Sequence, residues 1–169
     1  MKKLLAVLTL VFTCLWSTAF AADFSHLVIL HTNDTHGYDR RADRVNGMAT
    51  VAALKQDFEA KGYDVLLVDA GDAIQDNNLV NFSKGKTAID FMNAVGYDAM
   101  TLGNHEFDYG ADVTQERIQQ AKFPILSANI IVDATGKSFT PKTHAIVKKG
   151  KLRIGIFGLT TPSTITTSN

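Results

Sequence analysis

Short apolar runs alternate along the chain with longer stretches in which apolar side chains recur every three or four positions. The runs predict buried strands over residues 27–30, 65–68, 99–102 and 125–128. The periodic stretches predict helices over residues 47–61 and 86–94, and a third helix that begins at Asp112. This alternation of strand and helix is typical of an α/β fold with a mainly parallel sheet covered by helices.

Local signals predict where two of these helices begin. Asn46 is expected to cap the helix over 47–61, and Gly62 is expected to end it. Asp112 and Gln115 have the spacing of a capping box, so we expect their side chains to close the start of the third helix.

The pattern changes after Asn129. Two alternating segments, 143–148 and 152–157, flank the sequence Lys149–Gly150–Lys151. Such an arrangement predicts a β-hairpin that follows the helix-covered sheet.

The first 21 residues have the pattern of a signal peptide. Lys2 and Lys3 precede an apolar run over residues 4–16, and an Ala-x-Ala site ends at Ala21. A membrane-spanning helix needs about 20 apolar residues, which is longer than this run. We therefore expect export and cleavage after Ala21, with a periplasmic, cell-surface or extracellular destination and no stable membrane insertion.

Composition then excludes several classes of function. Removing Lys2 and Lys3 from the 17 basic residues leaves 15, against 17 acidic residues, for a net charge of −2. The sequence has no stripe of basic residues, so nothing in its charge pattern indicates a nucleic-acid partner. The single cysteine, Cys14, lies within the signal peptide. The mature chain would therefore have neither a disulfide nor a catalytic thiol.

Polar side chains crowd the ends of the first three predicted strands. The sequences that follow them are NDTHG at 33–37, DAGDA at 69–73 and GNHEFD at 103–108. Because the carboxyl ends of parallel strands form one rim, where ligands bind in open α/β sheets, the three clusters are expected to converge.

The residue types at this rim favour a metal site. Asp34 and His36 alternate along an extended segment, so a carboxylate and an imidazole can face one cation. Mixed oxygen and nitrogen ligands suit Mn, Fe, Zn or Co better than Ca. Each cluster alone also fits an ordinary role in an Asx-turn, a helix cap or a polar turn. Their joint occurrence at three consecutive strand ends favours the shared site.

These motifs resemble a known family. NDTHG, GDAIQ and GNHEFD, in this order, resemble the calcineurin-like metallophosphoesterases. The longer stretches ILHTNDTHG, MNAVGYDAMTLGNHEFDYG and GLTTP are similar to the exported bacterial 5′-nucleotidase and UDP-sugar hydrolase group. The likeness extends over residues 27–162 and implies the first half of an α/β/β/α sandwich.

The resemblance implies a pair of divalent metal ions, with Mn, Zn, Co, Mg or Fe as candidates. Asp34 and His36 match the ligands of the first ion, Asp72 matches the carboxylate that bridges both ions, and Asn104 matches a ligand of the second ion. Two cations about 3.5–4 Å apart lower the pKa of a shared water and neutralise the charge of a phosphate.

The resemblance also implies a catalytic dyad. His105 would stabilise the transferring phosphoryl group, Asp108 would orient its ring, and Asn104 and His105 would contact the substrate. Glu106 is expected to serve local structure, and Asp69 to bond nearby backbone. In-line attack by the bridging hydroxide would release phosphate from a nucleoside 5′-phosphate. UDP-sugars, 2′,3′-cyclic nucleotides or another phosphate ester remain alternative substrates.

The sequence departs from the family pattern after Phe107. Members of the family continue with a Gly-His motif and a Gly-His-x-His motif that supply further metal ligands, and neither occurs here. The second domain that holds the nucleobase in the nucleotidases is also not found. We therefore expect residues 22–169 to form a metallophosphoesterase domain that is incomplete at its C-terminus. By itself it would be nearly inactive, or an inactive metal-binding fragment.

Overall fold

The computed structural model describes residues 26–37 and 47–168 of the chain. The predicted signal peptide and the predicted cap at Asn46 lie outside the described residues. Within them, no helix is both long and apolar enough to span a membrane.

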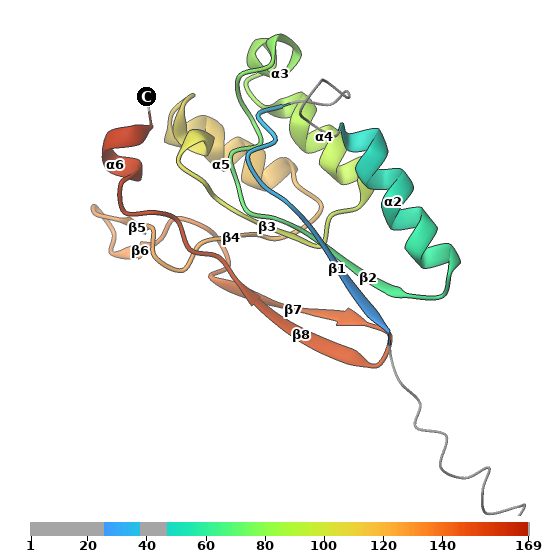
Figure 1. The fold of residues 1–169 in the computed structure, drawn as a ribbon. Coiled ribbons are helices and arrows are strands. Elements are labelled where there is room, and N and C mark those ends of the chain that lie inside the picture. The colour runs from blue at the N-terminus through green and yellow to red at the C-terminus, as the bar shows by residue number, and fades with distance from the viewer. Residues whose placement is uncertain (1–25, 38–46, 169) are drawn as a thin grey trace, which may run out of the picture.

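A parallel four-stranded sheet organises the fold (Figure 1). Its strands, in spatial order, are β1 (Leu27–Thr32), β2 (Asp64–Asp69), β3 (Ala99–Thr101) and β4 (Ile125–Leu126). All three neighbouring pairs are parallel. The predicted α/β class with a mainly parallel sheet is therefore confirmed.

Helices connect the strands and cover one face of this sheet (Figure 1). They are α2 (Met48–Ala60), α3 (Asn78–Phe82), α4 (Lys86–Val95) and α5 (Ala111–Gln120), with a short 3₁₀ helix, η1 (His105–Phe107), after β3. The core lies between the sheet and these helices, where Leu67, Ile74, Ile89 and Met92 are almost completely buried. Burying a side chain of this size contributes about 1.5–3 kcal/mol.

The opposite face of the sheet meets an antiparallel hairpin, β7 (His144–Lys149) and β8 (Leu152–Phe157) (Figure 1). Gly150 has φ +52° at the turn, in the left-handed region that hairpin turns require. The Nζ atom of Lys149 lies 2.7 Å from Asp98 Oδ1, which ties the hairpin to the end of the connection before β3. The predicted hairpin is confirmed.

Two further elements precede and follow this hairpin. A small antiparallel pair, β5 (Ile131–Val132) and β6 (Lys137–Ser138), comes before it, and α6 (Thr164–Thr167) comes after it. The sequence pattern predicted neither of them, nor did it predict α3.

The predicted capping box is wrong. α5 begins at Ala111 after Gly110, which has no side-chain cap. Gln115 instead donates from Nε2 to the carbonyl oxygen of Phe139, 2.7 Å away. The Gln115 side chain therefore makes a tertiary contact and does not cap the start of α5.

Candidate active site

The loops that follow β1 and β2 run side by side and continue the pairing of the two strands. Backbone N–H groups of one loop donate to carbonyl oxygens of the other over 2.8–3.0 Å. The bonds are Ala70 N to Thr32 O, Asp34 N to Gly71 O, His36 N to Asp72 O, and Gly37 N to Ala73 O. Both loops are therefore fixed in one register beyond the end of the sheet.

Three polar residues in these loops have left-handed backbones. The φ angles are +50° at Asp34, +49° at His36 and +58° at Asp72. Positive φ is uncommon outside glycine, and residues held there cost on the order of 1–3 kcal/mol each. The inter-loop hydrogen bonds hold this conformation, which turns all three side chains toward one place.

Asp34, His36 and Asp72 form a compact group. Each offers one ligand atom, and these atoms all lie within 4.8 Å of one another. His36 Nε2 lies 3.8 Å from Asp34 Oδ1. Burial raises the pKa of the Asp72 carboxyl, although a hydrogen bond from the His105 backbone opposes the shift. Two carboxylates and an imidazole so close together form a donor set that suits a divalent cation.

Glu106 joins the loop after β2 to the loop after β3. Its buried carboxylate accepts backbone N–H groups from Asp72 and Ala73, both at 2.8 Å, and from Gly103 at 2.6 Å. Burial raises the pKa of this carboxyl, and the three hydrogen bonds oppose that change. The predicted local structural role of Glu106 is confirmed, and its reach extends across two loops.

A second contact crosses between the same loops. The backbone N–H of His105 donates to Asp72 Oδ1 over 2.9 Å. Gly103 leaves space for this carboxylate, because a Cβ atom at that position would overlap Asp72. Residues from three strand ends are thus brought into one constellation.

His105 and Asp108 form a pair on η1 and the residue that follows it. His105 Nδ1 lies 2.8 Å from Asp108 Oδ2. This hydrogen bond is the main reason why the pKa of His105 is raised above its ordinary value. The ring centroid of His105 is 5.6 Å from that of His36, so the pair stands beside the Asp34–His36–Asp72 group.

Comparison with known proteins agrees with this geometry. The sequence model of the calcineurin-like phosphoesterases matches residues 27–155, which is most of the chain. The chain belongs to the calcineurin-like phosphoesterase family.

Several of the relatives that the chain matches are named 5′-nucleotidases. The chain is 38% identical to a snake venom 5′-nucleotidase of Crotalus adamanteus over 98% of its own length and 30% of the relative. It is 37% identical to protein UshA of Escherichia coli K12, over 98% of the chain and 31% of that protein. The crystal structure of a 5′-nucleotidase precursor from Thermus thermophilus superposes with a TM-score of 0.76 at 35% identity, covering 83% of this chain and 30% of that one. The chain thus spans about 30% of the length of these relatives.

Asn104 directly precedes His105, in the loop after β3. Its Nδ2 atom donates to the carbonyl oxygen of Thr167 at the end of α6, 3.2 Å away. The structure therefore brings Asp34, His36, Asp72, His105 and Asp108 together, whereas the amide nitrogen of Asn104 is engaged by another element.

Sequence reasoning missed Asp76. Its Oδ2 atom lies 2.6 Å from His36 Nδ1, although the two residues are 40 positions apart. Asp76 sits in an irregular loop before α3, where no periodicity predicts its direction. In contrast, the expected backbone bond of Asp69 is confirmed, because Asp69 Oδ1 accepts the Gly71 N–H over 2.8 Å.

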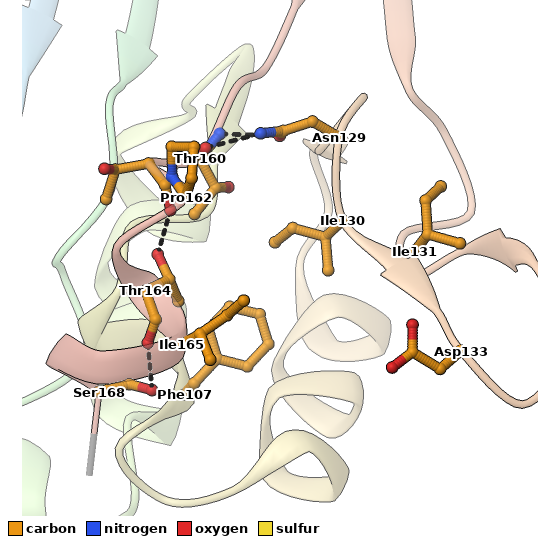
Figure 2. A pocket seen from close by; sticks show the side chains of 11 residues that line it. Phe107, Asn129, Ile130, Ile131, Asp133, Thr160, Pro162, Thr164, Ile165 and Ser168 are labelled. Carbon is orange, nitrogen blue, oxygen red and sulfur yellow. Dashed lines mark hydrogen bonds between the residues drawn. The ribbon is translucent and has the colours of Figure 1, made fainter.

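A groove of about 390 Å³ opens next to η1, lined in part by Phe107, Ile130 and Ile165 (Figure 2). Two of the polar residues that line it, Asn129 and Thr160, are reciprocally bonded through the Asn129 side chain and the Thr160 backbone. Among the described residues that line this groove, none is Lys, Arg or His. It is therefore poorly suited to a phosphate, and the candidate phosphate chemistry stays with the strand-end constellation.

Proposed function

We propose that this chain forms the N-terminal part of a metal-dependent phosphohydrolase that acts on nucleoside 5′-phosphates. The observation that carries the proposal is the joining of two groups, Asp34–His36–Asp72 and His105–Asp108, through the hydrogen bond from His105 N to Asp72 Oδ1. The relatives that are called 5′-nucleotidases support the substrate class.

The donor set fits divalent cations. Asp34, His36 and Asp72 would hold the first ion, and Asp72 with Asn104 would contribute to the second. When bound, such ions neutralise phosphate charge and lower the pKa of an attacking water. The raised pKa of Asp72 also fits, because burial penalises its negative charge and a bound cation would offset that penalty.

In this proposal His105 acts on the phosphoryl group. Asp108 occupies Nδ1 of the ring, so Nε2 is the nitrogen that remains for the substrate. The raised pKa of His105 favours the imidazolium, which can donate a hydrogen bond to a phosphoryl oxygen and stabilise its growing charge. Water adds to phosphorus, the ester P–O bond breaks, and the products are phosphate and the nucleoside.

The ligand count favours a second candidate for the isolated chain. Among the residues that match the family motifs, the second ion would have only Asp72 and Asn104, which would bind through its amide oxygen. Residues 22–169 alone would then bind one metal ion and turn over slowly or not at all. On this second proposal residues 22–169 bind a metal ion with little or no catalysis.

The test is metal binding and phosphate release by purified residues 22–169, with Mn²⁺ and AMP. We expect one tight Mn²⁺ equivalent that is weakened in Asp72→Asn and retained in His105→Ala. Any release of phosphate should fall about 10²–10³-fold in His105→Ala, the range for losing one hydrogen-bond donor that stabilises transition-state charge. Failure of the wild-type chain to bind Mn²⁺ would contradict the proposal.

We further propose that the protein is exported. The signal-peptide pattern over residues 1–21 supports this location, as does the venom origin of a 38% identical relative. Expression of the whole chain in a Gram-negative host, followed by fractionation and mass determination, should give a periplasmic product that begins at Ala22. Retention of Met1 in a cytoplasmic product would contradict export.

A further inference from the structure

We propose that Asp76 is a positioning residue that selects the tautomer of His36. By accepting a hydrogen bond from the N–H at Nδ1, it keeps the proton on that nitrogen and leaves the Nε2 lone pair free for a metal ion. The inference rests on the proposed function, because it assigns His36 as a ligand. It concerns a residue outside the strand-end motifs, in the loop that leads to α3.

The geometry around His36 divides its two ring nitrogens. Nδ1 lies 2.6 Å from Asp76 Oδ2, while Nε2 faces Asp34 Oδ1 at 3.8 Å. Nε2 is therefore the nitrogen of His36 that faces the carboxylate of Asp34 in the Asp34–His36–Asp72 group. A ligating histidine commonly donates its other N–H to a carboxylate, which fixes both the tautomer and the ring orientation.

A second neighbour favours the opposite tautomer. Gln75 is buried, and its Nε2 atom lies 3.1 Å from the same His36 Nδ1. An amide N–H can only donate, so it favours a bare Nδ1 and a proton on Nε2. The contact with Asp76 is shorter and is made to a carboxylate, and such charge-assisted hydrogen bonds are the stronger ones. Asp76 therefore prevails, and its removal leaves Gln75 to reverse the proton position.

The backbone at Asp76 indicates that this side chain is held there at a cost. Its φ is +72°, in a region that glycine enters freely, and its side chain is 60% exposed. Packing in the core therefore does not account for the strained backbone at Asp76. Strained residues of this kind concentrate at functional sites, where the surrounding contacts hold them.

The other histidine of the constellation has the same arrangement. Asp108 lies 2.8 Å from Nδ1 of His105, so a carboxylate occupies Nδ1 of both rings. The ring centroids are 5.6 Å apart, and Nε2 is the nitrogen of each ring that its carboxylate partner leaves unoccupied. His36 with Asp76 is thus the metal-side counterpart of the His105–Asp108 pair.

The test combines the whole chain with two variants. Asp76→Gly removes the carboxylate and relieves the positive φ. Lys84→Gly is the matched control, because Lys84 is exposed, has φ +47° and lies in the turn that follows α3. Nitrogen-15 NMR of the metal-free proteins at pH 8.5 reports the His36 tautomer, Zn²⁺ titration gives the affinity, and thermal melting gives the stability.

We expect a proton on His36 Nδ1 in the wild type and in Lys84→Gly, and on Nε2 in Asp76→Gly. Zn²⁺ affinity should fall about 10–100-fold in Asp76→Gly only, the usual effect of losing such a partner. The melting temperature of both variants should be equal to or above that of the wild type, because glycine relieves the strain. A residue with a purely structural role would not lower metal affinity while preserving stability.

The two readouts separate two failures. An unchanged His36 tautomer in Asp76→Gly would overturn the inference, whatever the chain binds. Failure of the wild-type chain to bind Zn²⁺ or Mn²⁺ would overturn the proposed function, whatever the tautomer is.

Discussion

The two faces of the parallel sheet are covered to different degrees. On the helix-covered face, Leu67 and Met100 are 0% and 1% exposed. On the hairpin face, Leu66 is 3% exposed, but Ile29, its partner in the β1–β2 register, is 59% exposed. The β7–β8 hairpin itself exposes Phe157. One face is a closed core, and the other is covered over β2 but open along β1.

This difference indicates which half of the structure supports the candidate site. The constellation stands on loops that leave β1, β2 and β3, and those strands are anchored by the helix-covered core. The hairpin contributes no residue to the compact metal-ligand group. Damage to the core should therefore weaken both stability and metal binding, whereas damage to the hairpin face should leave metal binding almost unchanged.

The largest expected effect comes from Leu67→Ala, compared with Leu66→Ala. The residues are adjacent and equally buried, but they lie on opposite faces because side chains alternate along a strand. Leu67→Ala should lower the free energy of unfolding by about 2–5 kcal/mol, since the closed core cannot collapse around the cavity. Leu66→Ala should lower the free energy of unfolding by about 1–3 kcal/mol, because the hairpin can move into part of the space that the side chain leaves. Urea denaturation of both variants checks this, and equal losses would show that the hairpin packs as firmly as the helices.

The next effect concerns a buried acid on the helix-covered face. Burial raises the pKa of Asp69 to about 7, from 3.8. The folded state therefore binds more protons than the unfolded state between these values, so stability is present below pH 4 and is lost as pH rises through 7. The two oxygens of Asp69 accept from Gly71 N–H and from the Thr32 hydroxyl. An asparagine can accept from Gly71 through Oδ1 and donate from Nδ2 to Thr32, whose hydroxyl can then donate to Tyr97.

Asp69→Asn should remove this loss. Between pH 5 and pH 8 the wild type should lose roughly 2–3 kcal/mol more than the variant, measured by urea unfolding at both values. Asp57→Asn, at an exposed acid on α2, is the matched control and should retain the wild-type slope. Parallel pH profiles for wild type and Asp69→Asn would contradict the prediction.

A smaller effect is expected where the hairpin is tied to the sheet. The Lys149–Asp98 pair is mostly buried, with side chains 19% and 16% exposed. Lys149→Met keeps the aliphatic stem but removes the cation from Asp98, which still accepts the Leu67 N–H. We expect the free energy of unfolding to fall by about 1–2 kcal/mol, since a mostly buried carboxylate loses its counter-charge. Lys61→Met breaks an exposed pair on α2 and should lower the free energy of unfolding by less than about 0.5 kcal/mol. Urea denaturation of both variants measures the two losses.

The smallest effect on stability is expected at the open surface. Phe157 and Ile146 are 66% and 60% exposed on the hairpin. Replacing both with serine should change the unfolding free energy by less than about 0.5 kcal/mol each. The same change should increase solubility, because it removes exposed apolar area. Light scattering and chemical denaturation measure the two effects, and a large loss of stability would show that this surface is packed in solution.

Much of this fold was accessible from local pattern. β1, β2 and the β7–β8 hairpin stand out because their side chains alternate or run continuously apolar between glycine and charged turns. The helix that was predicted to begin at Asp112 is present as α5, but its predicted capping box is wrong because the Gln115 side chain bonds to Phe139. α3, α6 and the β5–β6 pair are so short that periodicity cannot develop, and their positions follow from packing.

Some contacts of the candidate site were also predictable from the sequence, and others were not. Convergence of the strand ends follows from parallel topology, so the sequence alone is enough to group Asp34, Asp72 and His105. It is not enough for the Asp76–His36 contact, which depends on a loop conformation with positive φ. The three-way bond of Glu106 was equally hidden, since sequence does not show which backbone groups a buried carboxylate meets.

The inter-loop bonds beyond β1 and β2 also have a consequence for changes in chain length. Because Asp34, His36 and Gly37 donate to consecutive carbonyls from Gly71 to Ala73, the two loops are measured against each other residue by residue. Inserting or deleting one residue between Thr32 and Gly37, or between Ala70 and Ala73, would shift the later pairs and turn His36 away from Asp72. These two paired segments can therefore vary in side chain far more easily than in length, and a related chain that keeps the site should keep both of their lengths.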